Sequence, residues 1–232
     1  MTRRWLASVA AVLLCGCGLL GKPADVTTQD VRRASPEVQA LVPRAQAGDP
    51  EAQYALGMAY ESGTGVRLDA GESEKWLRKA AESGYAPAQY ELGAQLQTER
   101  RFAEGIAWLE RAAAQGHPGA NLMMGKAYDQ GLGVMRDSYK ALTYFEAAAN
   151  LGVAEAMWNI SLMFDEGRLG KKNPLHACIW GMRARRFAAE SDPMLVTQIT
   201  RAAPYLERPL SGQERSDCQR QAETWQPKGS AK

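Results

Sequence analysis

The feature that most constrains this chain is a pattern that recurs along it. Four glycines mark its phase at intervals of 36, 32 and 36 residues: Gly48, Gly84, Gly116 and Gly152. Each glycine is followed after four residues by alanine and after nine residues by a small residue, namely Gly57, Gly93, Gly125 and Ser161. A pattern that repeats every 32 to 36 residues indicates a stack of similar units rather than a single globular core.

The spacing within each unit predicts a pair of helices. Positions 4, 8, 9 and 12 after the phase glycine share one face of an α-helix, and the small residues there let a second helix approach closely. A glycine at position 15 (Gly63, Gly131 and Gly167) is expected to end this first helix in a left-handed conformation. The second helix carries a Trp or Tyr and ends with two alanines before the next phase glycine. The sequence therefore predicts an all-α fold of helical hairpins.

These residues resemble the Sel-one-like repeat family, which is related to tetratricopeptide repeats. The segments Ala52–Gly84 and Ala120–Gly152 match its pattern nearly throughout, including the Gly-x-Gly-Val loops that precede Asp69 and Asp137. The resemblance covers roughly residues 44 to 188. It implies a right-handed α-solenoid of antiparallel helix-turn-helix repeats that binds protein partners.

Two units depart from the family pattern in the loop between their helices. The second unit has a shortened loop, Gln97–Phe102, and the fourth has an irregular one, Gly167–Pro174. Irregular loops are where a repeat protein acquires individual character.

Helices that cap the repeat are predicted at both ends. Ser35 and Pro36 are expected to open an N-terminal helix that Pro43 kinks or divides. After the repeats, Asp192-Pro193 is expected to begin a helix that stops near Pro204. A capping box, Ser211 to Glu214, should begin another that runs to about Trp225. The predicted organisation is a targeting segment (1–16), a tether (17–34), the N-terminal cap with four repeats (35–190) and C-terminal capping helices with a tail (191–232).

The N-terminus has the features of an export signal. Arg3 and Arg4 precede an apolar stretch, Leu6–Leu14, that is too short to span a bilayer. The sequence Leu14-Cys15-Gly16-Cys17 resembles the lipobox of bacterial lipoproteins, and this resemblance implies acylation of Cys17. Gly18 would then imply sorting to the outer membrane, so the protein is expected in the periplasm, anchored to the inner leaflet. An ordinary cleaved signal peptide with incidental cysteines is the alternative.

Charge argues against a nucleic-acid partner. The chain has 28 basic residues, and loss of Arg3 and Arg4 with the signal would leave 26 against 26 acidic residues. A neutral protein lacks the basic surface that attracts phosphate backbones. Because no basic amphipathic helix is evident, membrane contact is expected from the lipid alone.

A disulfide is predicted between the two remaining cysteines. If processing removes Cys15 and acylates Cys17, only Cys178 and Cys218 remain, an even pair in an oxidising compartment. Cys178 lies in the second helix of the fourth unit and Cys218 in the helix expected to cap it. Two free, buried thiols are the alternative.

No group of residues indicates catalysis, a metal or a cofactor. His117 and His176 lie in different units without Cys or carboxylate partners, and Asp165-Glu166 is interpreted as a solvated pair at a helix end. The Gly-x-Gly loops lack the preceding strand and the Lys-Ser/Thr of a phosphate-binding loop. The chain is therefore not expected to be an enzyme.

A protein partner is expected to contact the concave face and the irregular loops. Position 6 of the units carries Tyr54, Tyr90, Leu122 and Trp158, nearly opposite the core stripe, with Met58 and Leu162 beside it. Packing between units is the alternative role for these residues. The candidate contacts are Tyr54, Tyr90, Trp158, Arg100, Arg101, Lys171 and Lys172.

Two functions follow from the resemblance. The first is a periplasmic immunity protein, since short lipid-anchored Sel-one-like proteins resemble those that neutralise type VI secretion phospholipase effectors. The second is an envelope scaffold in exopolysaccharide export or cell-wall assembly. An enzyme with a hidden site is a distant third. The sequence favours a monomer without deciding the oligomeric state.

Overall fold

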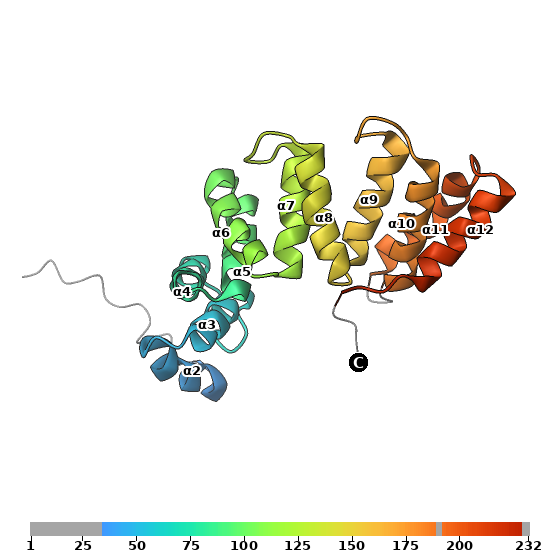
Figure 1. Cartoon of the computed structure of the whole chain (residues 1–232). Coiled ribbons are helices and arrows are strands. Elements are labelled where there is room, and N and C mark those ends of the chain that lie inside the picture. Colours follow the sequence, from blue (N-terminus) through green and yellow to red (C-terminus); the bar gives the residue numbers. More distant parts are fainter. Residues whose placement is uncertain (1–33, 189–191, 229–232) are drawn as a thin grey trace, which may run out of the picture.

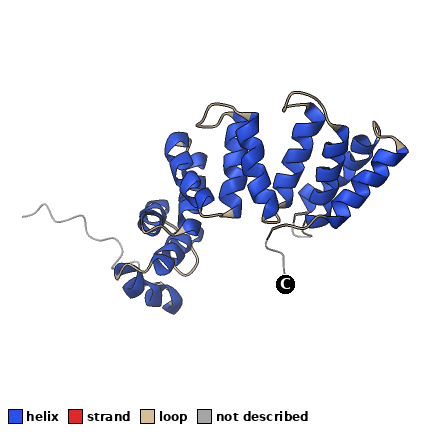
Figure 2. Cartoon of the chain, in the orientation of Figure 1, coloured by secondary structure: helices blue, strands red, loops and turns tan. Residues whose placement is uncertain are grey.

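A computed structural model describes residues 34–188 and 192–228, and these form an array of α-helices without a strand (Figure 2). The helices are, in chain order, α2 (Pro36–Gln46), α3 (Pro50–Ser62), α4 (Ala70–Glu82), α5 (Ala86–Thr98), α6 (Phe102–Ala114), α7 (Pro118–Gln130), α8 (Ser138–Asn150), α9 (Ala154–Glu166), α10 (Pro174–Phe187), α11 (Pro193–Glu207) and α12 (Gly212–Thr224). The predicted all-α repeat fold is confirmed.

The repeat units are successive pairs of helices: α3–α4, α5–α6, α7–α8 and α9–α10. Each pair packs on itself and on the next one, so that the units follow one another along a curved row from α2 to α12 (Figure 1). Buried apolar residues accordingly form several clusters spaced along the row. This is the distribution of a solenoid, in which each unit buries its face against a neighbour.

Local sequence sets where the helices begin and end. Asp69 and Asp137 are the N-cap residues of the second helices of units one and three, and their carboxylates accept hydrogen bonds from the first turn. At the other end of the first helices, Gly63, Gly131 and Gly167 adopt positive φ angles of 68°, 76° and 76°. The predicted left-handed caps are therefore present.

The small residues at position 9 bring the two helices of each unit together. A Cβ atom on Gly57 would lie 2.8 Å from the Leu77 side chain, and one on Gly125 would lie 2.5 Å from the Phe145 ring. In unit four, Ser161 takes this position, and its buried hydroxyl donates to the Ala177 carbonyl at 2.7 Å. In that unit a hydrogen bond to the backbone of α10 thus accompanies the close packing of the two helices.

Buried amides, which the sequence pattern did not reveal, join one unit to the next. The Gln53 side chain donates from Nε2 to the Ala45 carbonyl at 3.0 Å, and Gln89 makes the same bond to Ala81. Both carbonyls lie in the last turn of the preceding helix, and each also accepts a hydrogen bond from the following phase glycine, Gly48 or Gly84. The amides therefore tie unit one to α2 and unit two to α4.

The capping helices differ in two respects from prediction. Pro43 lies inside α2 and does not divide it, and α11 continues past Pro204 to Glu207. Each of these helices tolerates an internal proline because tertiary packing compensates for one missing hydrogen bond. Ser35 begins α2, and the capping box of Ser211 and Glu214 begins α12, as predicted.

Candidate functional site: the inner face of the array

The first helices of the units line the inner side of the curved row. Contacts join α5 to α7, α7 to α9 and α9 to α11, whereas α4, α6, α8 and α10 do not contact one another to that extent. Counted from the phase glycine of each unit, positions 3, 6, 7, 10 and 13 lie on the side of the first helix that faces away from its core stripe. We call this surface the inner face; it comprises Glu51, Tyr54, Ala55, Met58, Glu61, Tyr90, Glu91, Ala94, Leu122, Met123, Lys126, Asp129, Glu155, Asn159, Leu162 and Asp165.

Tyr54 and Tyr90 pack between units and are also partly exposed. The Tyr54 ring lies 5.5 Å from the Tyr85 ring at the start of α5, and Tyr90 stacks on His117 at 4.5 Å at the start of α7. Burial raises the pKa of both hydroxyls, and the nearby Glu91 carboxylate raises them further. These side chains therefore serve packing while presenting an edge to the inner face.

Trp158 does not suit the contact role proposed from the sequence. It is only 8% exposed and belongs to the core of the fourth unit, where its ring approaches Gly181 of α10. A Cβ atom on Gly181 would lie 2.8 Å from the Leu206 side chain and 3.9 Å from the Trp158 ring. Trp158 therefore contributes to packing, while the other position-6 residues, Tyr54, Tyr90 and Leu122, remain partly exposed.

Charged groups on the inner face are partly paired. Lys126 of α7 forms an ion pair with Glu155 of α9 at 2.6 Å, linking units three and four. No cation of residues 34–188 or 192–228 forms an ion pair with Glu91 of α5. Burial raises the pKa of its carboxyl, and the negative charge of Glu61 raises that pKa further. A carboxylate in this setting is favoured by any positive charge brought beside it.

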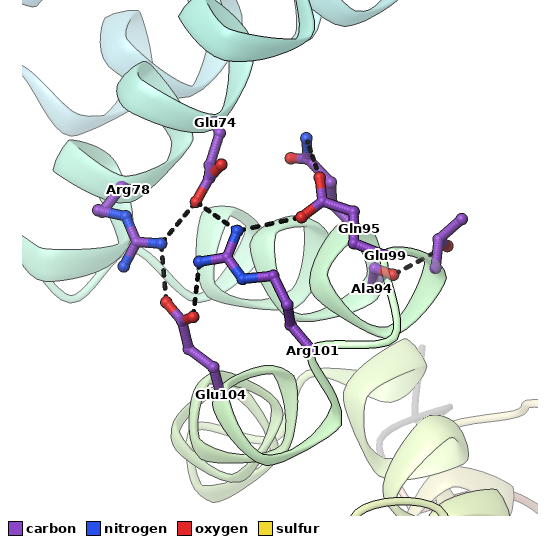
Figure 3. A network of polar contacts seen from close by, with 8 residues as sticks. Glu74, Arg78, Ala94, Gln95, Glu99, Arg101 and Glu104 are labelled. Atoms are coloured by element: carbon purple, nitrogen blue, oxygen red, sulfur yellow. Dashed lines mark hydrogen bonds and ion pairs between the residues drawn. The ribbon is translucent and has the colours of Figure 1, made fainter.

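Arg101 forms ion pairs with acidic residues of this protein. Its guanidinium donates to Glu104 at 2.6 Å, to Glu99 at 3.0 Å and to Glu74 at 3.1 Å, and Arg78 joins Glu74 and Glu104 from the other side (Figure 3). These hydrogen bonds raise the pKa of Arg101, the one with Glu104 contributing most. The network joins α4 to α6 at the shortened loop, so Arg101 has a structural role that its sequence position did not indicate.

The remaining predicted contacts lie in exposed loops away from the inner face. Arg100 adopts a φ of 64° in the shortened loop, a conformation that a glycine would adopt more easily. Lys171 and Lys172 are exposed in the loop between α9 and α10, seen at the upper edge of the row in Figure 1. In the same region Arg168 pairs with Asp129 and Glu166, at 2.5 and 2.6 Å. The structure thus does not bring all the predicted contacts together.

One histidine caps a helix, and the other packs beside an aromatic ring. His117 is the N-cap of α7 and accepts a hydrogen bond at Nδ1 from the Ala120 amide at 3.2 Å. Burial lowers the pKa of its imidazole. His176 lies 5.1 Å from the Phe164 ring. Over residues 34–188 and 192–228, no three His, Cys, Asp or Glu side chains are grouped as metal ligands would be.

Cys178 and Cys218 form a disulfide that joins α10 to α12, with Cα atoms 6.1 Å apart. This is the pairing expected from the sequence. Cys17 lies outside the described residues. Within the described part of the chain, no helix is long and apolar enough to cross a membrane.

Comparison with known proteins identifies the repeat. The Sel1 repeat pattern matches four consecutive segments, residues 50–85, 86–117, 118–153 and 154–181. The chain belongs to the Sel1 repeat family. The first three segments each contain one helix pair, and the fourth contains α9 and the first part of α10. Sel1 repeats mediate protein–protein interaction, which assigns this chain to the protein-binding class.

Two related sequences and one solved structure show how far the similarity extends. An uncharacterized protein of Neisseria meningitidis is 36% identical over 137 residues, which are 59% of this chain and 27% of that protein. A chitin synthase regulator of Saccharomyces cerevisiae is 29% identical over 58% of this chain and 19% of its own length. The chain thus spans less than a third of either relative. The crystal structure of a Sel1 repeat protein from Oxalobacter formigenes, 30% identical, superposes with a TM-score of 0.64 over 80% of this chain and 77% of that one.

Proposed function

We propose that this Sel1 repeat protein binds a secreted, membrane-attacking enzyme at its inner face and thereby protects the cell, as an immunity protein. The observation that carries the proposal is the inner face itself, a row of four first helices whose Tyr54, Tyr90 and Met58 side chains stay partly exposed. Partly exposed aromatic and Met residues are typical of the centre of protein interfaces. Inhibition would then follow from covering the partner's active site or its route to lipid.

Two features support an envelope location. The lipobox-like sequence ending at Cys17 would anchor the protein beside the membrane that such an enzyme attacks, in the periplasm at the inner leaflet of the outer membrane. The Cys178–Cys218 disulfide is the kind of bond that persists in an oxidising compartment. Anchoring near the target membrane would raise the effective concentration of the inhibitor there. A type VI secretion phospholipase effector is the partner we propose.

The second candidate is an envelope scaffold for polysaccharide export or cell-wall assembly. One relative is named as a chitin synthase regulator, so the repeat occurs in proteins that regulate a polysaccharide-synthesising enzyme. Both candidates use the inner face to hold an enzyme. They differ in whether the enzyme is an incoming toxin or a component of the cell's own envelope machinery.

Binding to the secreted enzymes encoded beside the gene tests the proposal. Ala94→Lys places a charged side chain at position 10 of unit two. The same position of unit three is already a lysine, Lys126, so we expect the variant to fold. Binding measured by calorimetry should weaken about tenfold or more, because the long side chain occupies the interface. Ala107→Lys on the exposed side of α6 is the matched control and should bind normally.

Protection of cells gives the second readout. Deleting the gene should make cells sensitive to the neighbouring effector. When the variant genes are returned to these cells, Ala94→Lys should restore protection less well than Ala107→Lys. If no neighbouring effector binds and deletion leaves sensitivity unchanged, the immunity proposal is wrong. Co-purification with polysaccharide-export or cell-wall proteins encoded nearby would then support the scaffold.

A further inference from the structure

The first helices of the units carry an excess of acidic residues. The first helices α3, α5, α7 and α9 contain one basic residue, Lys126, and the acidic residues Glu51, Glu61, Glu91, Asp129, Glu155, Asp165 and Glu166. The second helices α4, α6 and α8 carry acids and bases in similar numbers, and α10 has an excess of bases, Arg183, Arg185 and Arg186. A chain that is nearly neutral as a whole therefore presents a strongly negative inner side.

Helical geometry places these acids on the inner face. Glu51 and Glu155 occupy position 3 of their units, Glu91 position 7, and Glu61 and Asp165 position 13. These positions lie opposite the buried stripe at positions 4, 8 and 12. The acids therefore point away from the core toward the space enclosed by the curve.

Several of these carboxylates are not neutralised within the protein. Glu155 pairs with Lys126, while Asp129 and Glu166 share Arg168. Among the described residues, no cation is paired with Glu61, Glu91 or Asp165. Glu91 is also partly buried between the helices that carry Tyr54 and Tyr90. A partly desolvated carboxylate beside aromatic rings is a favourable environment for a lysine or arginine side chain.

We propose that the inner face binds a basic segment of its protein partner, with a lysine or arginine placed between Glu61 and Glu91 and flanked by Tyr54 and Tyr90. The inference rests on the proposed function in so far as both assign the inner face to a protein partner. It adds the chemistry of that partner, which is positively charged rather than acidic. Arg100, Arg101, Lys171 and Lys172, all outside this face, are then not the contacts that define specificity.

The physical reason is complementarity of charge. A row of unpaired acids repels phosphate and acidic surfaces and attracts a basic one, and repulsion of the wrong partners contributes to specificity. The aromatic and Met side chains provide apolar contact for the stem of a lysine or arginine. Each unit contributes at least one acid to this face, although at different positions, so a basic segment that lies along several helices can meet more than one carboxylate.

Selection from a random peptide library displayed on phage tests this chemistry without requiring the natural partner. The bait is the full chain, and the comparison is between wild type and the double variant Glu61→Gln, Glu91→Gln. The matched control is Glu110→Gln, Glu146→Gln, which removes the same charge from exposed positions of α6 and α8. All three proteins are first checked for equal thermal unfolding.

We expect wild type and control to enrich peptides with lysine or arginine beside an apolar residue. A selected peptide should bind the inner-face variant about tenfold more weakly, with affinity that falls as salt is raised. Enrichment of peptides without a cation, equal binding by both double variants, or no enrichment at all would each overturn the inference. If the natural partner binds the inner-face variant as well as wild type, the inference fails and the proposed function stands. If cationic peptides are selected but no effector binds, the proposed function fails and the inference stands.

Discussion

At the scale of single residues, small side chains decide how closely helices approach. Gly125 faces the fully buried Phe145 ring, so that a Cβ atom would come within 2.5 Å of it. Such a ring has no free space into which to move, since protein interiors are close-packed. The glycines at position 9 are therefore required by packing between the helices of a unit rather than by backbone conformation.

Gly125→Ala should therefore destabilise the protein despite its better helix propensity. Overpacking a well-packed core typically costs about 1–3 kcal/mol. Urea unfolding measures the change in free energy. Gly212→Ala is the control, because an added Cβ atom meets nothing within 4 Å at that position, and the free energy of unfolding should hardly change. Equal stability of the two variants would show that the α7–α8 contact is looser than described.

His117 makes stability depend on pH at the junction of units two and three. Its Nδ1 must be unprotonated to accept the Ala120 amide, and burial lowers its pKa in the folded state. The unfolded chain, with a histidine pKa of about 6.5, therefore binds the proton first as pH falls. Stability should decrease as pH drops below about 6.5 and be fully present above it.

His117→Asn keeps an N-cap acceptor without this titration. Thermal unfolding of wild type and variant should be compared between about pH 7.5 and 5, above the range of most carboxylates. As pH falls, we expect the melting temperature of the variant to decrease less than that of wild type. A constant difference across this range would mean that His117 protonates equally in the folded and unfolded states.

At the scale of elements, α12 is attached to α10 by few buried side chains, by the disulfide and by hydrogen bonds from Arg183 and Arg186 to its last carbonyls. Only Cys218 and Ala222 are buried in this polar helix. Beyond its end, the Trp225 ring packs on Trp180 at 5.9 Å, and Arg186 of α10 donates to the Trp225 carbonyl at 3.0 Å. The disulfide is therefore a principal attachment of α12 to the array.

Reduction should release α12 before the rest of the protein unfolds. Closing a 40-residue loop stabilises by about 4 kcal/mol in the chain-entropy model, usually an upper value. Limited trypsin digestion with mass spectrometry should show new cleavage after Arg215 and Arg220 in reduced protein. The Cys178→Ala, Cys218→Ala variant should be cleaved there with or without reductant. Protection of α12 in that variant would show that packing alone holds the helix.

At the scale of the whole molecule, the predicted anchor would decide where the array works. If Cys17 is acylated, the wild-type protein should fractionate with outer membranes. Cys17→Ser should be released or remain unprocessed. Cys15→Ser is the matched control, because bulky Leu14 does not fit the position before an acylated cysteine, and this variant should remain membrane-bound. Normal processing and membrane attachment of Cys17→Ser would contradict the anchor.

What the sequence by itself determined is the part of the fold that depends on neighbours a few positions away. The repeat phase, the αL glycines such as Gly63, the Asp137 cap and the Ser211 capping box all depend on local backbone geometry. The disulfide was also predictable, because the predicted processing leaves only Cys178 and Cys218 and because Cys218 lies in a helix expected to cap the unit that holds Cys178. Such features depend on residues that lie within one helical turn or one unit of each other.

Only the tertiary structure decided the role of residues whose partners are distant in the chain. Trp158 occupies the same repeat position as Tyr54, yet it is buried in a core cluster that includes residues of α10 and α11, whereas Tyr54 stays partly exposed. Arg101 is exposed in a loop, yet Glu74, 27 residues earlier, pairs with it. The negative inner face likewise arises from acids in separate units that the curvature of the array brings to one side. Burial and charge depend on what surrounds a residue in space, which the repeat pattern alone does not specify.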